Sequence, residues 1–467
     1  MKKLKIGFIP AHRNLMDEKY AIKTKETILK NLKKNSEIDI SVPDMQLTEG
    51  GLVRSEKDSE KVVELFKKEK IDALLIIAIT YGDEKSIFSI VEEFCDIPVI
   101  LFAIKDPEIP NNEYFKSAAS CGAIPMSFGL HRRKIKFIFG GIVDVEDKKF
   151  SDNIASFIKV SKAVKKFRKA RIGMIGQRQD SFEVCAVNEG LMIEKYKQRI
   201  IPLNLIDLQN DIEKIKDNDN DVTRIIDDIV SKSECSFKRE DLSKIAKLEL
   251  IMLNYAKDYG LDAFTFQCWT AAQEHLGITP CLINGRITNL GYPVSCEGDV
   301  YGALSMLLQR ELAAKEQKNP LLLDLLMPHP KEENLFLVWH CGNASILTKN
   351  DDQVAKISSH CPFGDIFGLE KGVATLEFMF KSGIITINRL VEHSGVFKLL
   401  SVVGNMVKRP DRIRGAWSWV EVKDRNKMYD IIFREGFTHH ISVIQEDISS
   451  HLEDLCKFLD FELIKTD

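Results

Sequence analysis

Four side chains in the C-terminal third of the chain could together bind a divalent metal ion: Glu297, Asp324, His340 and His440. Two carboxylates and two imidazoles form a mixed set of oxygen and nitrogen ligands. Such a set suits Mn²⁺, Mg²⁺, Fe²⁺ or Co²⁺ in an open, reactive site, whereas structural zinc prefers a closed shell of thiolates. The residue types therefore indicate a site for one of these ions, provided that the fold brings the four residues together.

Two acidic residues lie where an extended stretch gives way to a helix that we predict over residues 298–315. The apolar segment before Glu297 should place this residue at a protected corner between strand and helix, which favours metal binding. Asp299 stands at the start of the same helix. A carboxylate there complements the helix dipole, and this is the interpretation that we favour for Asp299.

Asp324 and His340 each allow two interpretations. Leucines flank Asp324 on both sides. Because an unpaired carboxylate is costly to bury, Asp324 is either a surface residue of a helix or a metal ligand. His340 ends the apolar run 335–339, which predicts a strand. A strand end suits a ligand, but a core histidine with its hydrogen bonds satisfied would give the same pattern.

The pair His439-His440 follows a turn at Gly436. Adjacent side chains of a strand point to opposite faces, so only one of the two imidazoles can face a metal ion. The residues alone do not choose between them.

Composition limits the class of protein. A chain of 467 residues predicts two or three domains, and 44% hydrophobic with 29% charged residues is typical of a folded protein. The formal net charge of −3 gives no reason to expect a nucleic-acid partner. We expect no membrane association, because no run of about 18 apolar residues is present.

The cysteines and the N-terminal sequence predict a cytoplasmic location. The ten cysteines include no Cys-x-x-Cys pair, which favours free thiols in a reducing compartment over a disulfide framework or a zinc site. The first residues run directly into a strand pattern, so a signal peptide is not expected.

The first half of the chain alternates apolar runs with amphipathic segments. Strands are predicted at 6–9, 73–79, 98–102 and 135–139, with helices such as 60–68 and 85–93 between them. A second unit begins near Arg171, with further strands at 263–267 and 280–283. Such alternation predicts parallel sheets covered on both faces.

After residue 350 the pattern changes to successive strands at 375–380, 384–390, 398–403 and 416–422, with a final helix at 449–458. Consecutive strands predict an antiparallel sheet or barrel. The expected fold class is thus α/β: two N-terminal doubly wound parallel-sheet domains followed by a mostly antiparallel, barrel-like domain. We place the domains at 1–168, at 169–350 with Glu297, Asp324 and His340, and at 351–467 with His440.

Polar loops follow three of the predicted strands, at 12–14, 80–84 and 176–180. Ligands of open α/β sheets collect at the carboxyl ends of strands, although each loop could equally be plain turn chemistry. Arg13 and Arg178 are the stronger candidates, because a guanidinium can bind a sugar hydroxyl, a phosphate or a sulfonate.

The order of the motifs resembles the L-fucose isomerase and L-arabinose isomerase superfamily. The resemblance lies in Glu297-Gly298-Asp299, Asp324, Trp339-His340 and the pair His439-His440 after Gly436. The segments 5–10 and 171–176 also resemble the starts of the two N-terminal domains of that family. The resemblance implies a divalent-metal-dependent aldose–ketose isomerase that moves a proton between C1 and C2 of a sugar through a cis-enediol.

The resemblance also implies residue roles. The metal ligands would be Glu297, Asp324, His340 and His440, with Mn²⁺ as the expected ion and Mg²⁺, Co²⁺ or Fe²⁺ as alternatives. Glu297 and Asp324 would also form the catalytic acid–base pair. The expected substrate contacts are His12, Arg13, Tyr81, Gln177, Arg178, Trp339 and His439. The family further implies a homo-oligomer, a hexamer or a related assembly, with active sites at subunit interfaces.

The substrate is left open between a neutral pentose or deoxyhexose and an anionic sugar such as sulfoquinovose, because sulfoquinovose isomerases resemble this superfamily. An anionic sugar would need a cation at its tail, and Arg13, Arg178, Arg286 and Arg414 are candidates that the sequence does not rank. The alternative function is a non-catalytic, cytoplasmic sugar-binding or regulatory protein on the same α/β scaffold. Suitable residues at all four metal positions favour the enzyme.

Overall fold

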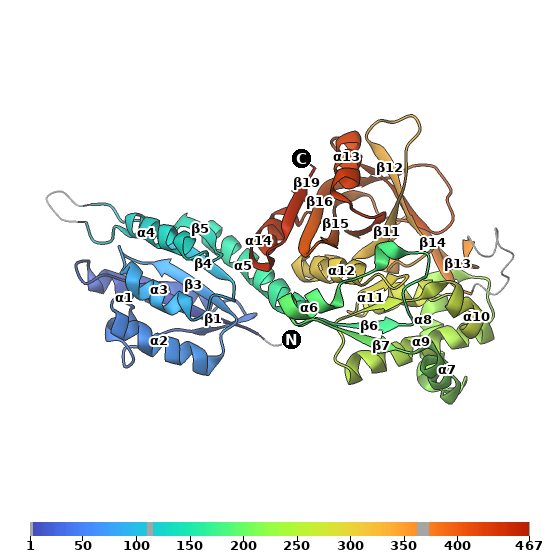
Figure 1. The fold of residues 1–467 in the computed structure, drawn as a ribbon, viewed down its shortest axis with the longest axis horizontal. Helices are drawn as coiled ribbons and strands as arrows, with labels where there is room; N and C mark the ends of the chain where they lie inside the picture. Colours follow the sequence, from blue (N-terminus) through green and yellow to red (C-terminus); the bar gives the residue numbers. More distant parts are fainter. Residues whose placement is uncertain (1–2, 110–114, 362–372, 467) are drawn as a thin grey trace. The chain divides into compact units, whose positions relative to one another are not determined.

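The computed structural model describes residues 3–109, 115–361 and 373–466 (Figure 1). The chain forms two compact units, one of Met1–Lys165 with Asp454–Asp460 and one of Lys166–Glu453 with Phe461–Asp467. Across the described ranges, no helix is both long enough and apolar enough to cross a membrane.

The first unit is built on a five-stranded parallel sheet. Its strands run in the order β2 (Ile38–Ser41), β1 (Leu4–Ala11), β3 (Ala73–Ala78), β4 (Val99–Ile104) and β5 (Ile138–Val143). β3 and β4 are buried along their whole length, which explains their continuous apolar sequences. The sequence did not predict β2, and β5 begins three residues after the predicted start at 135.

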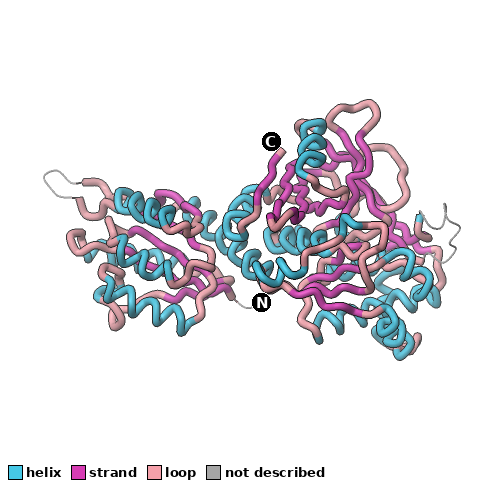
Figure 2. The backbone as a smooth tube through the Cα atoms, viewed as in Figure 1, coloured by secondary structure: helices cyan, strands magenta, loops and turns pink. Residues whose placement is uncertain are grey.

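Helices cover both faces of this sheet, as Figure 2 shows. α2 (Glu56–Glu69), α3 (Glu84–Glu92) and α4 (Ala119–Arg132) pack on the face that includes Leu101 and Ala103. Phe102 points to the opposite face, where its ring lies 5.2 Å from that of Phe150 in α5 (Lys148–Phe167). α1 (Glu18–Leu32) follows β1 in the chain. The first unit is therefore doubly wound, as predicted.

The second unit contains a four-stranded parallel sheet. Its order is β10 (Val294–Cys296), β9 (Ala263–Phe266), β6 (Arg171–Ile175) and β7 (Arg199–Leu203). The predicted strand at 280–283 is wrong, because these residues begin helix α11 (Cys281–Asn289) with Pro280 as its N-cap. A short apolar run fits a buried helix as well as a strand, and proline is common where helices begin. The other helices of this part are α6 (Glu189–Tyr196), α7 (Leu205–Lys214), α8 (Asn220–Lys232), α9 (Arg239–Asp258) and α10 (Gln273–Leu276).

Six antiparallel strands of the same unit close into a ring. Their order is β16 (Val396–Val407), β15 (Gly383–His393), β18 (His440–Ile444), β11 (Leu321–Pro328), β12 (Leu335–His340) and β17 (Ala416–Glu421), and β17 pairs back onto β16. Closure leaves no free edge among these strands. The predicted barrel-like, mostly antiparallel sheet is thus confirmed.

Further elements extend the barrel. β19 (Glu462–Lys465) joins β16, and β14 (Thr375–Met379), β13 (Ala355–Ser358) and β8 (Ser233–Cys235) continue the sheet beyond β17. Helices α13 (Arg425–Glu435) and α14 (Ser449–Leu459) lie between the last strands in the chain. The predicted helix at 449–458 corresponds to α14.

Asp324 and His340 lie on strands of the barrel. The sequence grouped both with the second α/β domain, but β11 and β12 pair with β18 and β17, which are C-terminal. Asp324 is therefore a strand residue, and its interpretation as a surface residue of a helix is wrong. The predicted domain boundaries at 168 and 350 stay predictions.

Helix α12 (Val300–Leu312) lies between the parallel sheet and the barrel, with β9 and β10 on one side and β15 and β18 on the other (Figure 1). Nearly all its residues are buried, as expected for a helix that is apolar all round. Its one buried amide, Gln309, donates to the carbonyls of Thr386 and Ser442 at 3.1 and 3.0 Å. The C-terminal half of α12 is therefore tied to the barrel strands β15 and β18.

Candidate active site

The four predicted metal ligands lie on or directly after four different strands. Glu297 follows β10, Asp324 lies in β11, His340 ends β12 and His440 begins β18. The strand register places Asp324 opposite His440 on one side and opposite Trp339 on the other. The barrel thus supplies three of the residues, and the parallel sheet supplies Glu297.

The side chains converge on the His440 ring. Its Nε2 atom lies 3.0 Å from Glu297 Oε2 and 3.7 Å from Asp324 Oδ1. The ligand atoms of Glu297, His340 and His440 lie within 4.8 Å of one another, and so do those of Asp324, His439 and His440. The structure therefore brings all four predicted ligands into one cluster.

The cluster has polar atoms that a ligand would satisfy. Among the described residues, no hydrogen-bond partner reaches Asp324 Oδ1 or His340 Nε2, although both atoms are buried. An unsatisfied buried polar atom costs free energy that an ion or a substrate oxygen would recover. Carboxylate oxygens and imidazole nitrogens at this spacing fit a divalent cation of the Mn²⁺ type.

The backbone at Glu297 has an unusual conformation. Glu297 has φ of 64° and Gly298 has φ of 78°, which are left-handed backbone values that residues other than glycine rarely adopt. The N–H of Glu297 donates to the carbonyl of Phe266 at 2.7 Å. A Cβ on Gly298 would lie 2.6 Å from Arg178 Cα, so only glycine fits there. This tight turn directs Glu297 from the end of β10 into the cluster.

Asp299 orients His440. As predicted, its carboxylate caps α12, accepting from the Gly302 N–H at 2.8 Å. It also accepts from His440 Nδ1 at 2.9 Å and from Arg389 Nη2 at 3.0 Å, and both partners are buried. Burial opposes the ionisation of Asp299, but the charge of Arg389 holds the pKa of this carboxyl far below its usual range.

The tautomer of His440 follows from this contact. An ionised carboxylate can only accept, so His440 Nδ1 must carry a proton and Nε2 faces Glu297 and Asp324. A carboxylate behind the histidine is the usual arrangement in metal sites, because it fixes the ring and makes it more basic. The sequence analysis missed this role of Asp299 and did not consider Arg389 at all.

Burial and mutual charge shift the pKa values of the cluster. Burial raises the pKa of Asp324 to about 7, and the neighbouring charge of Glu297 acts in the same direction. Burial lowers the pKa of His340 to about 4. Burial also opposes the charging of His440, but its bonds to Asp299, Cys185 and Glu297 raise its pKa well above the ordinary value. Near neutral pH, His340 is therefore neutral in the metal-free protein, whereas the bonds of His440 favour its charged form until a cation takes the place of the Nε2 proton.

His340 presents a donor to the cluster. Its Nδ1 accepts from the backbone N–H of Cys341 at 2.9 Å, so the proton of the neutral ring lies on Nε2. In this tautomer His340 can donate to a ligand oxygen, and it can bind a metal ion only after giving up the bond to Cys341.

The loop 176–188 after β6 forms one wall of the site. The sheet order reverses between β6 and β9, and such switch points are where open α/β sheets bind ligands. The N–H of Gln177 donates to Gln267 Oε1 at 3.0 Å, which ties the loop to the end of β9. The Phe182 ring lies 5.9 Å from that of His439, and Cys185 contacts His440. No sequence pattern pointed to Phe182 or Cys185.

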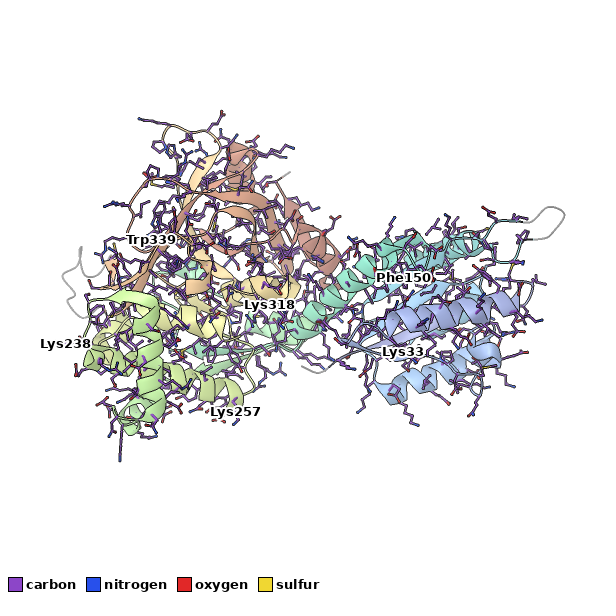
Figure 3. All side chains as sticks on the ribbon, turned by 180° about the vertical axis from the view of Figure 1, so that it is seen from behind. Lys33, Phe150, Lys238, Lys257, Lys318 and Trp339 are labelled. Carbon is purple, nitrogen blue, oxygen red and sulfur yellow. The ribbon has the colours of Figure 1, made fainter. Side chains whose placement is uncertain are left out.

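Trp339 and His439 flank the cluster. Trp339, labelled in Figure 3, is partly buried and donates from Nε1 to the Arg414 carbonyl at 2.6 Å. His439 is exposed, with its Nε2 3.8 Å from Asp324 Oδ1. Both are placed where a ligand of the cluster could contact them.

His12, Arg13 and Tyr81 belong to the first unit and lie at the switch point between β1 and β3. His12 Nδ1 lies 3.0 Å from Thr80 Oγ1. The guanidinium of Arg13 lies 4.8 Å from the centre of the Tyr81 ring and donates to the Gly82 carbonyl at 2.7 Å. The polar loops that the sequence singled out in this unit therefore meet at one sheet edge.

Comparison with known proteins agrees with this geometry. Residues 7–168 match the family described as fucose/sulfoquinovose isomerase, N-terminal domain, and residues 338–466 match L-fucose isomerase, C-terminal domain. A sulfoquinovose isomerase of Priestia aryabhattai is 26% identical over 420 residues, 88% of this chain and 89% of the relative. One of Alkalicoccus urumqiensis is 22% identical over 400 residues, which cover 84% and 86% of the two chains.

The chain belongs to the fucose/sulfoquinovose isomerase family. It is accordingly an aldose–ketose sugar isomerase. This result supports the enzyme over the non-catalytic sugar-binding protein.

The pKa of Asp324 predicts a pH-dependent effect of Asp324→Asn on metal-free protein. Folding raises the pKa of Asp324 from 3.8 to about 7, so the folded state binds the proton of this carboxyl more tightly than the unfolded state does. The protonated carboxyl therefore contributes stability at low pH, and this contribution is lost as pH rises through 7. Asn carries no charge, so the variant should gain stability over the parent by a few kcal/mol between pH 4 and 8. Urea unfolding midpoints in chelator would measure the gain, and a stability difference that does not change with pH would contradict it.

Proposed function

We propose that the protein is a divalent-metal-dependent isomerase that interconverts the aldose and ketose forms of an anionic sugar of the sulfoquinovose type. The observation that carries the metal dependence is the buried cluster around His440, in which Nε2 lies 3.0 Å from Glu297 and 3.7 Å from Asp324. The residues that we propose as ligands are Glu297, Asp324 and His440, with His340 as a fourth in its other tautomer. Mn²⁺ is the proposed ion, with Mg²⁺, Co²⁺ or Fe²⁺ as alternatives.

Aldose–ketose interconversion requires a proton to move between C1 and C2. A divalent cation held by these residues would polarise the sugar carbonyl and stabilise the negative charge that develops on its oxygen. Asp299 and Arg389 hold the His440 ring so that Nε2 faces the substrate side of the cluster. When His340 is not a ligand, the proton on its Nε2 can instead be donated to a sugar oxygen.

Glu297 and Asp324 form the acid–base pair. One carboxylate takes the proton from C2 while the other carboxyl group, in its protonated form, gives a proton to O1, and the cis-enediol results. The second group then takes the proton from O2 and the first returns its proton to C1, which gives the ketose. The strained turn at Glu297 and the cross-strand position of Asp324 place both carboxylates on the same imidazole. Burial raises the pKa of Asp324 to about 7, which is suited to proton transfer near neutral pH.

The names of the relatives favour an anionic sugar. Sulfoquinovose is a glucose with a sulfonate at C6, so its reacting carbons and its charge lie at opposite ends. The relatives named sulfoquinovose isomerase match across most of this chain. The remaining substrate contacts are proposed at Gln177, Trp339 and His439, which lie on or beside the cluster.

We also propose that the chain acts as a homo-oligomer in the cytoplasm, as its family resemblance implies. In this arrangement His12, Arg13 and Tyr81 contact the substrate held by a neighbouring subunit. The buried His12 Nε2 supports this, because it has no hydrogen-bond partner within the described ranges. Sedimentation combined with kinetics tests the arrangement, and a fully active monomer would contradict it.

The test of the proposed function is an isomerisation assay with sulfoquinovose. We expect the purified protein to form the ketose, to lose activity after chelation and to recover it with Mn²⁺. Glu297→Gln should lower kcat by about 10²- to 10⁴-fold, the usual contribution of an acid–base group, with the fold retained. Glu316→Gln, at an exposed carboxylate, serves as the control.

Two outcomes would count against the proposal. Rates that are indifferent to chelation would exclude the metal role. Near-normal turnover by Glu297→Gln would exclude this residue as the acid or base.

A further inference from the structure

Arg178 lies at the edge of the cluster. Its backbone packs against Gly298, the residue after Glu297, so closely that a Cβ on Gly298 would lie 2.6 Å from Arg178 Cα and 2.9 Å from its backbone nitrogen. Four residues further along the same loop, Phe182 contacts the rings of His439 and His440. Arg178 is therefore on the wall of the site, next to one of its proposed ligands.

The guanidinium of Arg178 has hydrogen-bond donors that no protein acceptor uses among the described residues. Its Nη1 atom donates to the carbonyls of Gln179 and Asp180, both at 3.0 Å. Within the part of the chain that the structure describes, it forms no ion pair with a carboxylate, and the side chain is partly exposed. A guanidinium has five N–H donors, so Nε and Nη2 remain for a ligand.

The other arginines considered as anion sites are committed to carboxylates. Arg286 binds Glu249 at 2.5 Å and Asp228 at 2.8 Å. Arg414 binds Glu377 at 3.0 Å, and Arg13 binds Glu84 at 3.2 Å. Each already has its charge balanced, so an anionic substrate would have to displace a carboxylate from it.

Because the site carries negative charge, it can bind an anionic substrate only with the help of an unpaired positively charged side chain. Glu297 and Asp324 repel an anionic substrate, and the buried Arg389 is bound to Asp299. To bind at this site, a sulfonate therefore needs a positively charged side chain that is not already paired with a carboxylate. Arg178 meets this requirement, and its long side chain starts beside Glu297.

We propose that Arg178 is the residue that selects a sulfonated sugar, by binding the sulfonate at C6 while C1 and C2 lie at the cluster around His440. The inference rests on the proposed isomerase function and deepens it. A guanidinium binds sulfonate oxygens through charge-assisted hydrogen bonds, so the contact adds affinity for the anionic sugar and none for a neutral one.

The test compares two sugars that differ only in the anion. Sulfoquinovose and its neutral counterpart 6-deoxyglucose are assayed with Mn²⁺-loaded protein carrying Arg178→Gln, Arg178→Lys or no substitution. Arg178→Gln should lower kcat/KM for sulfoquinovose by about 10- to 100-fold, mainly through KM, and leave kcat/KM for 6-deoxyglucose unchanged. Arg178→Lys should recover part of the loss, because it restores the charge without the fork of donors.

Arg199→Gln is the matched control. Arg199 also donates to a backbone carbonyl, that of Gln198 at 2.8 Å, but it begins β7 and so lies at the edge of the sheet opposite the site. The same loss of charge there should change the kinetics of neither sugar. An equal effect of Arg199→Gln on sulfoquinovose would show that net charge, and not a contact by Arg178, is responsible.

Calorimetric binding of the sulfonated polyol, the reduced form of sulfoquinovose, separates this inference from the isomerase function because no turnover is needed. Weaker binding of the polyol by Arg178→Gln supports the contact, even if no sugar is isomerised. A failure to isomerise any sugar would overturn the proposed function but not the contact. Equal losses of kcat/KM for both sugars would make Arg178 a structural residue and overturn the inference. Unchanged binding of the polyol by Arg178→Gln would also overturn it.

Discussion

The site depends on one buried carboxylate, that of Asp299. It caps helix α12 through the Gly302 N–H, pairs with Arg389 of β15 and accepts from His440 of β18. These three contacts join the helix between the two sheets to two neighbouring barrel strands. Because a buried charge is costly unless it is paired, removal of one member would leave another charge uncompensated. The orientation of His440 is therefore built into the packing of the second unit.

The barrel and the parallel sheet position the residues of the cluster in different ways. The closed barrel fixes Asp324 opposite His440 through strand register, which a shift of one residue would destroy. The parallel sheet contributes Glu297 from a turn with two successive left-handed residues. Strain of this kind, about 1–3 kcal/mol for a residue in a sparsely populated region, persists only where the surroundings enforce it. Here α12 and the contact of Gly298 with Arg178 hold the turn.

Much of the fold could be predicted from periodicity. The buried strands β3 and β4 appear in the sequence as continuous apolar runs, and the C-terminal strands appear as successive strands without helices. The incorrect predictions have two separate causes. The run at 280–283 is too short to distinguish a buried helix from a strand, and no local pattern shows that β11 and β12 pair with strands about a hundred residues later.

The candidate site could be predicted in its residue types but not in its connections. The four ligand positions were proposed from chemistry and family resemblance, and the structure places them together. Asp299 was explained as a helix cap, and this is correct but incomplete, because its partners lie about 90 and 140 positions away in the chain. A charged residue within an apolar strand was the available signal for Arg389, since such a charge must be paired.

In the proposed site, Glu297, Asp324 and His440 share one cation. Anomalous diffraction from crystals grown with Mn²⁺ tests it directly, because the metal alone gives a strong peak at its absorption edge. We predict a single strong peak within bonding distance of Glu297, Asp324 and His440. A peak bound elsewhere, or no peak at this cluster at saturating Mn²⁺, would contradict the claim.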